Sequence, residues 1–181
     1  MNFCVEACVD ASLAANGASA GIAGEVVCGH DRASLRSVYQ YQYHLPIPNI
    51  HDAEWAAVLI AACYMNSWEM NWLIRGNANV SCVSASIHTD RDCNLDRLSS
   101  CMAYYSWNFR RMYRVELDVK HMNRTEDWLV QQNARARAAR LLPLGTAVAN
   151  GWPWLQSVRP ITWEHVCSPI SVVVPSNQWM P

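Results

Sequence analysis

The sequence predicts a mixed α/β domain with a five-stranded sheet, in which three antiparallel strands precede two parallel ones and helices flank the sheet. Short links join the first three strand-like segments, which should therefore form an antiparallel meander. The later strand-like segments alternate with helical ones, the usual pattern of parallel strands with crossover helices. The chain has 181 residues, 51% of them hydrophobic and 16% charged, enough for one domain with a core of its own.

The meander is predicted from composition and from alternation. Residues 3–10 are mostly Cys, Val and Ala and indicate a buried strand. Residues 20–28 indicate a second strand after a glycine-containing turn. Residues 35–44 alternate aromatic and polar side chains, which predicts a third strand with one buried face.

Helices and strands alternate in the second half of the predicted domain. Pro46 and Pro48 interrupt the chain, and Asn49 or Asp52 can cap a helix that runs to about Trp68. A strand, a helix, a strand and a helix should follow over residues 80–88, 93–106, 112–121 and 125–140.

The C-terminal part differs in composition. Residues 141–181 hold six of the eight prolines and four of the nine tryptophans. The prolines argue against helices there, and the tryptophans argue against full disorder. We therefore expect a domain over residues 1–140 and an irregular, Pro- and Trp-rich extension over residues 141–181 that packs on it and can also dock a protein partner.

The cysteines and the apolar segments indicate an intracellular protein. None of the eight cysteines forms a C-x-x-C pair, and several lie in apolar runs, so reduced and buried thiols are expected. The longest apolar stretch, around residues 56–63, is too short to cross a bilayer. The N-terminus carries no secretory pattern. We expect no membrane interaction.

Charge is unevenly distributed. The net charge is −1, yet residues 110–140 hold eight basic and four acidic residues, and all but one of those basic residues are arginine. Arginine suits bidentate contact with phosphate groups. A solvated helix face is the alternative explanation for such a run.

Three acidic residues stand at the ends of predicted elements. Asp10 ends the first strand, Glu54 lies at the start of the first helix, and Asp90 ends the fourth strand. Carboxylates from separate elements can converge on Mg²⁺ or Mn²⁺, and two such ions roughly 3.5–4 Å apart can hydrolyse a phosphodiester. Glu54 could instead complement a helix dipole, and Asp90 could cap a helix. Asp10 would be costly to bury unpaired.

The order of these elements and acids resembles that of the ribonuclease H family. The motif sequences are closer to the retroelement and plant-type members of that family. The resemblance covers about residues 3–140 and lies in Asp10-Ala11-Ser12, Ala53-Glu54-Trp55, Thr89-Asp90 and residues 119–129. It implies a ribonuclease H-like sheet with two Mg²⁺ or Mn²⁺ ions at one end of its strands, which cleave the RNA strand of an RNA–DNA hybrid. Asp10, Glu54 and Asp90 are then catalytic metal ligands. Ala11 departs from the family, which usually has glycine there.

The resemblance leaves the fourth ligand open between two positions. Asn123 precedes Asp127 by four residues, which matches the family's spacing and slightly favours Asp127 as catalytic ligand. A family histidine ten residues before the ligand, matched by His121, points instead to Gln131. With Gln131 there, three carboxylates could still hold metal, with altered activity. His121 itself is implied to shuttle protons or aid product release, and a structural role is the alternative.

Further residues are candidates for nucleic-acid binding. Polar side chains near the presumed site can reach the 2′-hydroxyls that mark RNA, and each can also be a turn or cap residue; they are Ser12, Asn16, Asn49 and His51. Arginines that flank the last strand are candidates for phosphate contacts; they are Arg110, Arg111 and Arg124. Three arginines further along the last helix are expected to face solvent; they are Arg135, Arg137 and Arg140.

Two functions therefore remain in view. The first is a metal-dependent endonuclease acting on the RNA strand of RNA–DNA hybrids, free-standing or as a retroelement domain. The second is a non-catalytic ribonuclease H-like module that binds nucleic acid or protein in a larger nucleoprotein assembly. Another nuclease or integrase of the same fold also stays open, since a fold does not fix a function. The side chain at the fourth ligand position distinguishes the first two.

Overall fold

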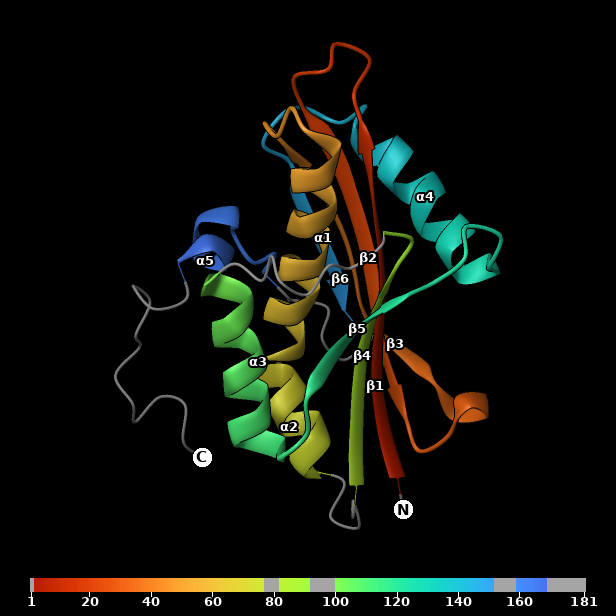
Figure 1. Ribbon diagram of the computed structural model, residues 1–181, viewed down its shortest axis with the longest axis vertical. Coiled ribbons are helices and arrows are strands. Elements are labelled where there is room, and N and C mark those ends of the chain that lie inside the picture. The colour runs from red at the N-terminus through yellow and green to blue at the C-terminus, as the bar shows by residue number, and fades with distance from the viewer. Residues whose placement is uncertain (1, 77–81, 92–99, 152–158, 169–181) are drawn as a thin grey trace.

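The computed structural model describes residues 2–76, 82–91, 100–151 and 159–168, and a twisted six-stranded sheet runs through its middle (Figure 1). Its strands are β1 Asn2–Leu13, β2 Ala20–Gly29, β3 Arg36–Leu45, β4 Cys82–Thr89, β5 Leu117–His121 and β6 Ala147–Gly151. They lie side by side in the order β5-β4-β1-β2-β3-β6.

The strand directions confirm the predicted sheet. β1 and β2 are antiparallel, as are β2 and β3, while β4 runs parallel to β1 and β5 parallel to β4. The sixth strand was not expected. β6 comes from the C-terminal extension and pairs antiparallel with β3 at the far edge.

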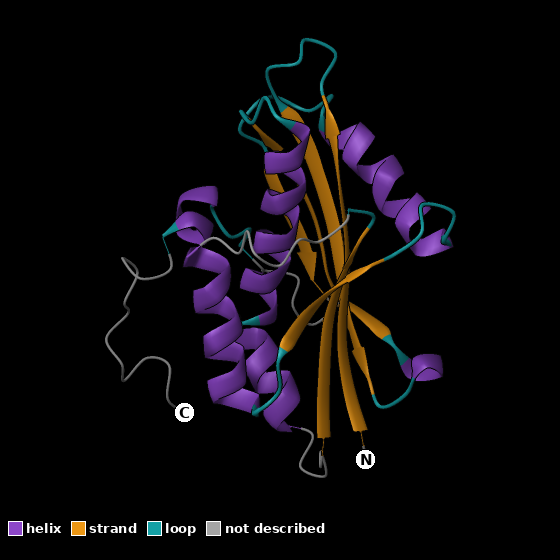
Figure 2. Cartoon of the chain, in the orientation of Figure 1, coloured by secondary structure: helices purple, strands orange, loops and turns teal. Residues whose placement is uncertain are grey.

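Helices lie on both faces of the sheet (Figure 2). They are α1 Ile50–Met65, α2 Trp68–Gly76, α3 Ser100–Tyr113, α4 Asp127–Ala139 and α5 Trp163–Cys167, with a short 3₁₀ turn at Arg32–Ser34. α1 packs on β1 and β2 and is covered in turn by α3 and α5. Among the described α-helices, only α4 packs on the opposite face, against β1, β2 and β3.

Buried tyrosines join β3 to α1. Tyr39, Tyr41 and Tyr43 alternate along β3 and point to the same face, as predicted for this strand, and all three are fully buried. The rings of Tyr39 and Tyr41 lie 4.9 and 5.0 Å from the ring of Tyr64 on α1. The side chain of Asn49 caps α1 by accepting from the backbone N–H of His51 at 2.8 Å. The tyrosines and the cap together fix where α1 lies and where it begins.

α4 approaches the sheet closely at Gly21 of β2, where there is no side chain to keep the helix away. A Cβ on Gly21 would stand 2.1 Å from the carbonyl oxygen of Ala136. Arg135 donates to the carbonyl oxygens of Gly24 and Tyr41, and Arg140 donates to that of Leu13. The expectation that Arg135 and Arg140 face solvent is therefore wrong, because these guanidinium groups satisfy sheet carbonyls at the α4 interface.

The described part of the C-terminal extension packs on the domain. Besides β6, it forms the one-turn helix α5, and neither element was expected from its proline content. Tyr43 donates to the carbonyl oxygen of Ile161, and Tyr105 donates to that of Val166. Residues 152–158 and 169–181, which include three of its tryptophans, lie outside the described residues.

Two other expectations concern the helix after β4 and the cysteines. The predicted helix over residues 93–106 overlaps α3, which begins at Ser100, and residues 92–99 lie outside the described part. Every described cysteine side chain is a free thiol. Burial raises the pKa of the Cys28 and Cys63 thiols to about 11, so both stay protonated. Over the described ranges, no helix has the length and apolar character needed to cross a membrane.

Candidate active site

Asp10, Glu54 and Asp90 line a single pocket of about 350 Å³. Asp10 lies in the central strand β1, Glu54 lies in the first turns of α1, and Asp90 directly follows β4. The structure thus brings together the three acids that the sequence singled out, from three separate elements.

The sheet register explains why two of these acids meet. Cys8 on β1 lies opposite His88 on the parallel strand β4. Continuing this register by two residues places Asp90 beside Asp10. β4 ends at Thr89 while β1 continues to Leu13, so the sheet opens at this point and α1 and α4 border the opening.

Burial and mutual repulsion act on the carboxylates. The pKa of Glu54 is raised to about 7, first by burial and then by the charges of Asp90 and Asp10, against the opposing charge of Arg91. The pKa of Asp10, which is only 4% exposed, is also raised, chiefly by burial and further by Asp90. A positive charge in this pocket would relieve both effects.

Each acid has a different nitrogen partner. The Nδ2 of Asn133 on α4 donates to the Oδ2 of Asp10 at 2.7 Å. The Nε of Arg124 donates to the Oδ2 of Asp90 at 3.0 Å, and the Nε of Arg91 lies 3.9 Å from the Oε2 of Glu54. The other oxygen of Asp90, Oδ1, is buried without a hydrogen-bond partner. A buried acceptor in that state is an available metal ligand.

The donor set suits a hard divalent cation by its chemistry. Carboxylate and carboxamide oxygens are the ligands that Mg²⁺ and Mn²⁺ prefer, and the Oδ1 of Asp90 lacks any other partner. Within the described ranges, however, no group of three or more His, Cys, Asp or Glu side chains is already arranged around a possible metal position. The acids line one pocket, and they pair separately with Asn133, Arg91 and Arg124.

Neither expected candidate for the fourth ligand lines this pocket. Asp127 is the exposed first residue of α4, and Gln131 is exposed on the next turn. Asn133 and Arg137 face the pocket instead, one helical turn apart, along with Leu129. The sequence did not single out Asn133, and it predicted that Arg137 faces solvent; Arg137 is exposed and also lines the pocket. Asn133 follows Leu129 by four residues and Arg137 follows it by eight, so this helical spacing was the available signal, but using it requires knowing which side of α4 faces the pocket.

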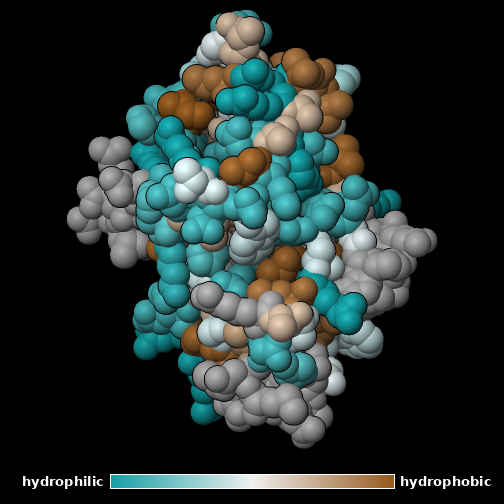
Figure 3. Space-filling model, turned by 90° about the vertical axis from the view of Figure 1, so that its right-hand side faces the viewer, coloured by the Kyte–Doolittle hydropathy of each residue, from teal (hydrophilic) through white to brown (hydrophobic). Residues whose placement is uncertain are grey.

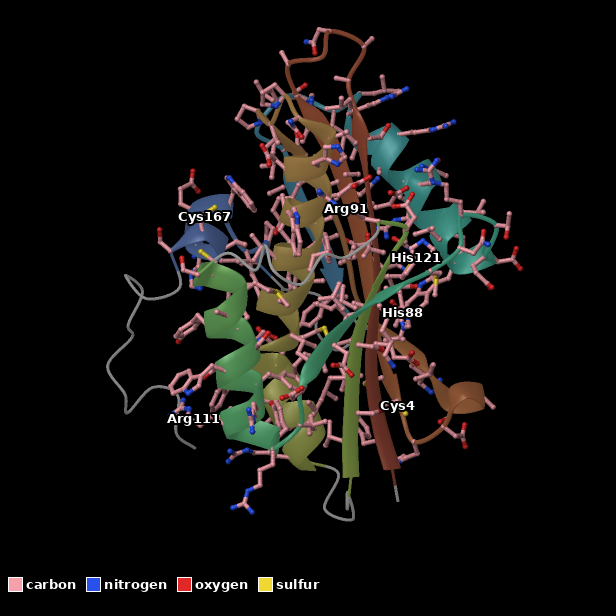
Figure 4. The ribbon with its side chains drawn as sticks, viewed as in Figure 1. Cys4, His88, Arg91, Arg111, His121 and Cys167 are labelled. Carbon is pink, nitrogen blue, oxygen red and sulfur yellow. The ribbon has the colours of Figure 1, made fainter. Side chains whose placement is uncertain are left out.

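The other predicted site residues are dispersed. Arg124 lines the pocket, and the Oγ of Ser12 accepts from Arg140 at 3.0 Å. Asn16 stabilises the β1–β2 turn by accepting from the N–H of Ala18, and Asn49 caps α1. His121 ends β5 opposite Thr89 and is exposed (Figure 4).

Arg110 and Arg111 lie at the C-terminal end of α3, away from the acids. Arg110 approaches Glu116 at 3.6 Å, and the guanidinium of Arg111 stands 5.1 Å from the ring centre of Trp107. Figure 4 shows Arg111 at the opposite end of the helical layer from Arg91. The basic side chains that do border the acidic pocket, Arg124 and Arg137, come from the α4 side, where the surface is mainly hydrophilic (Figure 3).

The strand order, the strand directions and the placement of α1 and α4 make this a ribonuclease H-like fold. Among solved structures, the chain is similar to ribonuclease H1 from the archaeon Halobacterium salinarum, with 13% identity, a TM-score of 0.40, and coverage of 75% of this chain and 93% of that one. It is also similar to the foamy viral protease-reverse transcriptase solved in complex with an RNA/DNA hybrid, with 15% identity and a TM-score of 0.41.

That second likeness covers 76% of this chain but only 19% of the viral protein. A further structure, the native prototype foamy virus protease-reverse transcriptase, has 10% identity, a TM-score of 0.37, and coverage of 77% of this chain and 21% of that one. No protein-family model matches the chain, and the search of curated proteins found no match.

Proposed function

We propose that this protein is a metal-dependent endonuclease that hydrolyses the RNA strand of RNA–DNA hybrids. The observation that carries the proposal is the convergence of Asp10, Glu54 and Asp90 on one pocket at the opening of the sheet, with one buried carboxylate oxygen of Asp90 left unpaired. Acids that repel one another in a partly buried pocket destabilise the fold. A cation that binds them offsets the unfavourable free energy of this repulsion and burial.

The three carboxylates would hold Mg²⁺ or Mn²⁺, which supplies an activated water and stabilises charge on the attacked phosphate. The chain's own groups would do the rest. Asn133 holds the carboxylate of Asp10 in one orientation through its 2.7 Å hydrogen bond. Arg124 and Arg137 lie on the α4 side of the pocket, where they can bind the phosphates that flank the cleaved bond.

Arg124 must exchange partners for this to happen. Its side chain is 81% exposed, and its bond to Asp90 is therefore a solvated one of small net energy. When the metal ion binds Asp90, Arg124 can bind a phosphate of the nucleic acid in place of Asp90. Asp127 and His121 do not line the pocket, so this proposal gives neither of them a role in metal binding or catalysis.

A second candidate function is a non-catalytic ribonuclease H-like module that binds nucleic acid. One observation favours it. A neutral amide, Asn133, and a cation, Arg137, face the pocket from α4, where a fourth carboxylate would complete the metal site. Two adjacent metal ions carry four positive charges, and three carboxylates neutralise fewer of these than four would.

A cleavage assay on a hybrid with an end-labelled RNA strand distinguishes the two functions. With Mg²⁺ or Mn²⁺, the wild type should release RNA fragments and leave a labelled DNA duplex intact, and Asp10→Asn should release none. Asp127→Asn is the matched control and should cleave as the wild type does, because Asp127 is exposed outside the pocket. Binding without cleavage in both metals would establish the module; absence of binding and cleavage would contradict both functions.

A further inference from the structure

A second pocket adjoins the acidic one and has a different character. It has a volume of about 520 Å³ and lies between the start of α1, the loop before it and α5. Apolar rings and aliphatic side chains make most of its wall, with a few polar groups among them. The principal lining residues are Pro46, Pro48, His51, Trp55, Arg91 and Trp163.

The helical repeat places the two pockets side by side. Ile50 and Glu54 line the acidic pocket, whereas His51 and Trp55, each one residue later on α1, line the second one. Arg91 connects them: its guanidinium carbon stands 5.7 Å from the ring centre of Trp55, and its Nε lies 3.9 Å from Glu54. It also donates to the backbone carbonyl of His51, which holds it between the pockets.

We propose that this second pocket binds an unpaired base of the nucleic acid whose phosphate lies at the acidic pocket. The inference rests on the proposed nucleic-acid function and adds a ligand for residues outside the acidic pocket. The volume is in the range of pockets that enclose small planar ligands. Indole faces and an arginine are the groups on which bases stack, each stack contributing about 1–3 kcal/mol.

The base must be unpaired because a base inside a duplex has its faces covered by its neighbours. An unpaired base at the end of a hybrid, or in a strand that continues past it, presents a free face to Trp55 or Trp163. His51 and Asp52 lie in the same wall; at the edge of the base, His51 can donate or accept a hydrogen bond and the carboxylate of Asp52 can accept one. The guanidinium of Arg91 can bind the phosphates of a nucleic-acid strand, which a neutral peptide lacks.

The test compares hybrids that differ only past the duplex end. Affinity is measured in EDTA, so cleavage is not required, for a blunt hybrid, a hybrid with a short unpaired overhang, and the same overhang with abasic sites. Overhangs at either end of either strand are tried. For the wild type, the best overhang should bind roughly fivefold or more tightly than its abasic counterpart.

Substitutions at α5 locate the effect. Trp163→Leu keeps an apolar side chain for packing but removes the stacking face, so the gain from the overhang should disappear while blunt-hybrid affinity stays. Trp163→Phe should retain part of the gain. Trp107→Leu is the matched control, because Trp107 is 56% exposed on α3 and does not line this pocket; it should leave the gain unchanged.

The outcomes distinguish this inference from the proposed function. Equal affinity for normal and abasic overhangs, or a gain that survives Trp163→Leu, would overturn the base site even if the protein cuts hybrids. A Trp163-dependent gain without any cleavage would support the base site and contradict the nuclease. A proline-rich peptide that binds through Trp163, with no overhang effect, would make this a peptide site and overturn the inference.

Discussion

Asn133 on α4 donates a 2.7 Å hydrogen bond to Asp10 on the central strand β1. This bond joins the helix on one face of the sheet to the most buried acid of the pocket, which is 4% exposed. The bond offsets part of the cost of keeping Asp10 charged, since it lowers a pKa that burial raises. The amide of Asn133 can act here in two ways. Its nitrogen can donate to Asp10 and orient that carboxylate, or the amide can flip so that its neutral oxygen becomes a metal ligand.

Replacing this amide with a carboxylate should strengthen metal binding and weaken the metal-free fold. Asn133→Asp places a second acid beside Asp10, so metal-free stability should fall by about 1–3 kcal/mol. Mn²⁺ should then raise the melting temperature of Asn133→Asp more than that of the wild type. Asn133→Leu is the control that loses the hydrogen bond without adding charge. An equal Mn²⁺ effect in all three proteins would place Asn133 outside the metal site.

Phosphate contacts should come from the α4 side rather than from α3. Arg124 and Arg137 line the acidic pocket, while Arg110 and Arg111 pair with Glu116 and Trp107 at the end of α3. Each phosphate contact contributes a salt slope of roughly −0.7 to −0.9 in log affinity against log salt. The double variant Arg124→Ala, Arg137→Ala should therefore bind hybrid more weakly and with a flatter slope.

The matched double variant Arg110→Ala, Arg111→Ala removes the same charge from α3 and should leave both quantities close to those of the wild type. The readout is fluorescence anisotropy with a hybrid at several salt concentrations, with circular dichroism to check folding. A slope that flattens only in the α3 variant would mean that the nucleic acid crosses α3, as the sequence alone first suggested.

Metal-free stability should fall as the pH rises from about 4.5 to about 7. The pKa of Glu54 is about 7 in the folded protein and near 4.5 when unfolded, so the folded state binds the extra proton between these values. Stability from this group is complete below about pH 4.5 and is lost toward pH 7, at about 1.4 kcal/mol per pKa unit. The raised pKa of Asp10 acts in the same direction.

Urea unfolding in EDTA at about pH 5 and about pH 8 measures this effect. Glu54→Gln cannot ionise and should flatten the dependence, and Mg²⁺ should restore stability to the wild type at the higher pH. A wild type that is equally stable at both pH values would contradict the buried, repelling site.

Local patterns predicted most of the fold. The tyrosine alternation on β3, the Asn49 cap of α1 and the short links of the meander are each encoded in neighbouring residues, and each is observed. β6 was missed because Ala147–Gly151 is short and weakly patterned, and it is a strand because β3 offers a free edge. Arg135 and Arg140 were placed wrongly because their partners are carbonyls of distant strands.

From the sequence, only those site residues could be predicted that lie at the ends of predicted helices and strands. Asp10, Glu54 and Asp90 stand at element ends, where the sequence makes them conspicuous. Asn133 and Arg137 lie inside a helix, and which face of α4 meets the pocket depends on the contact of Ala136 with Gly21 of β2. That contact is tertiary, so it cannot be predicted from the spacing of residues after His121 or Asn123.

The most direct test of the metal site is a calorimetric titration of Mn²⁺ into three proteins: the wild type, Asp10→Asn and Asp127→Asn. The wild type should bind Mn²⁺, Asp10→Asn should lose most of that binding, and Asp127→Asn should bind as the wild type does, because Asp127 is exposed outside the pocket. Equal binding by the wild type and Asp10→Asn, or no binding by the wild type, would contradict a metal site built on Asp10, Glu54 and Asp90.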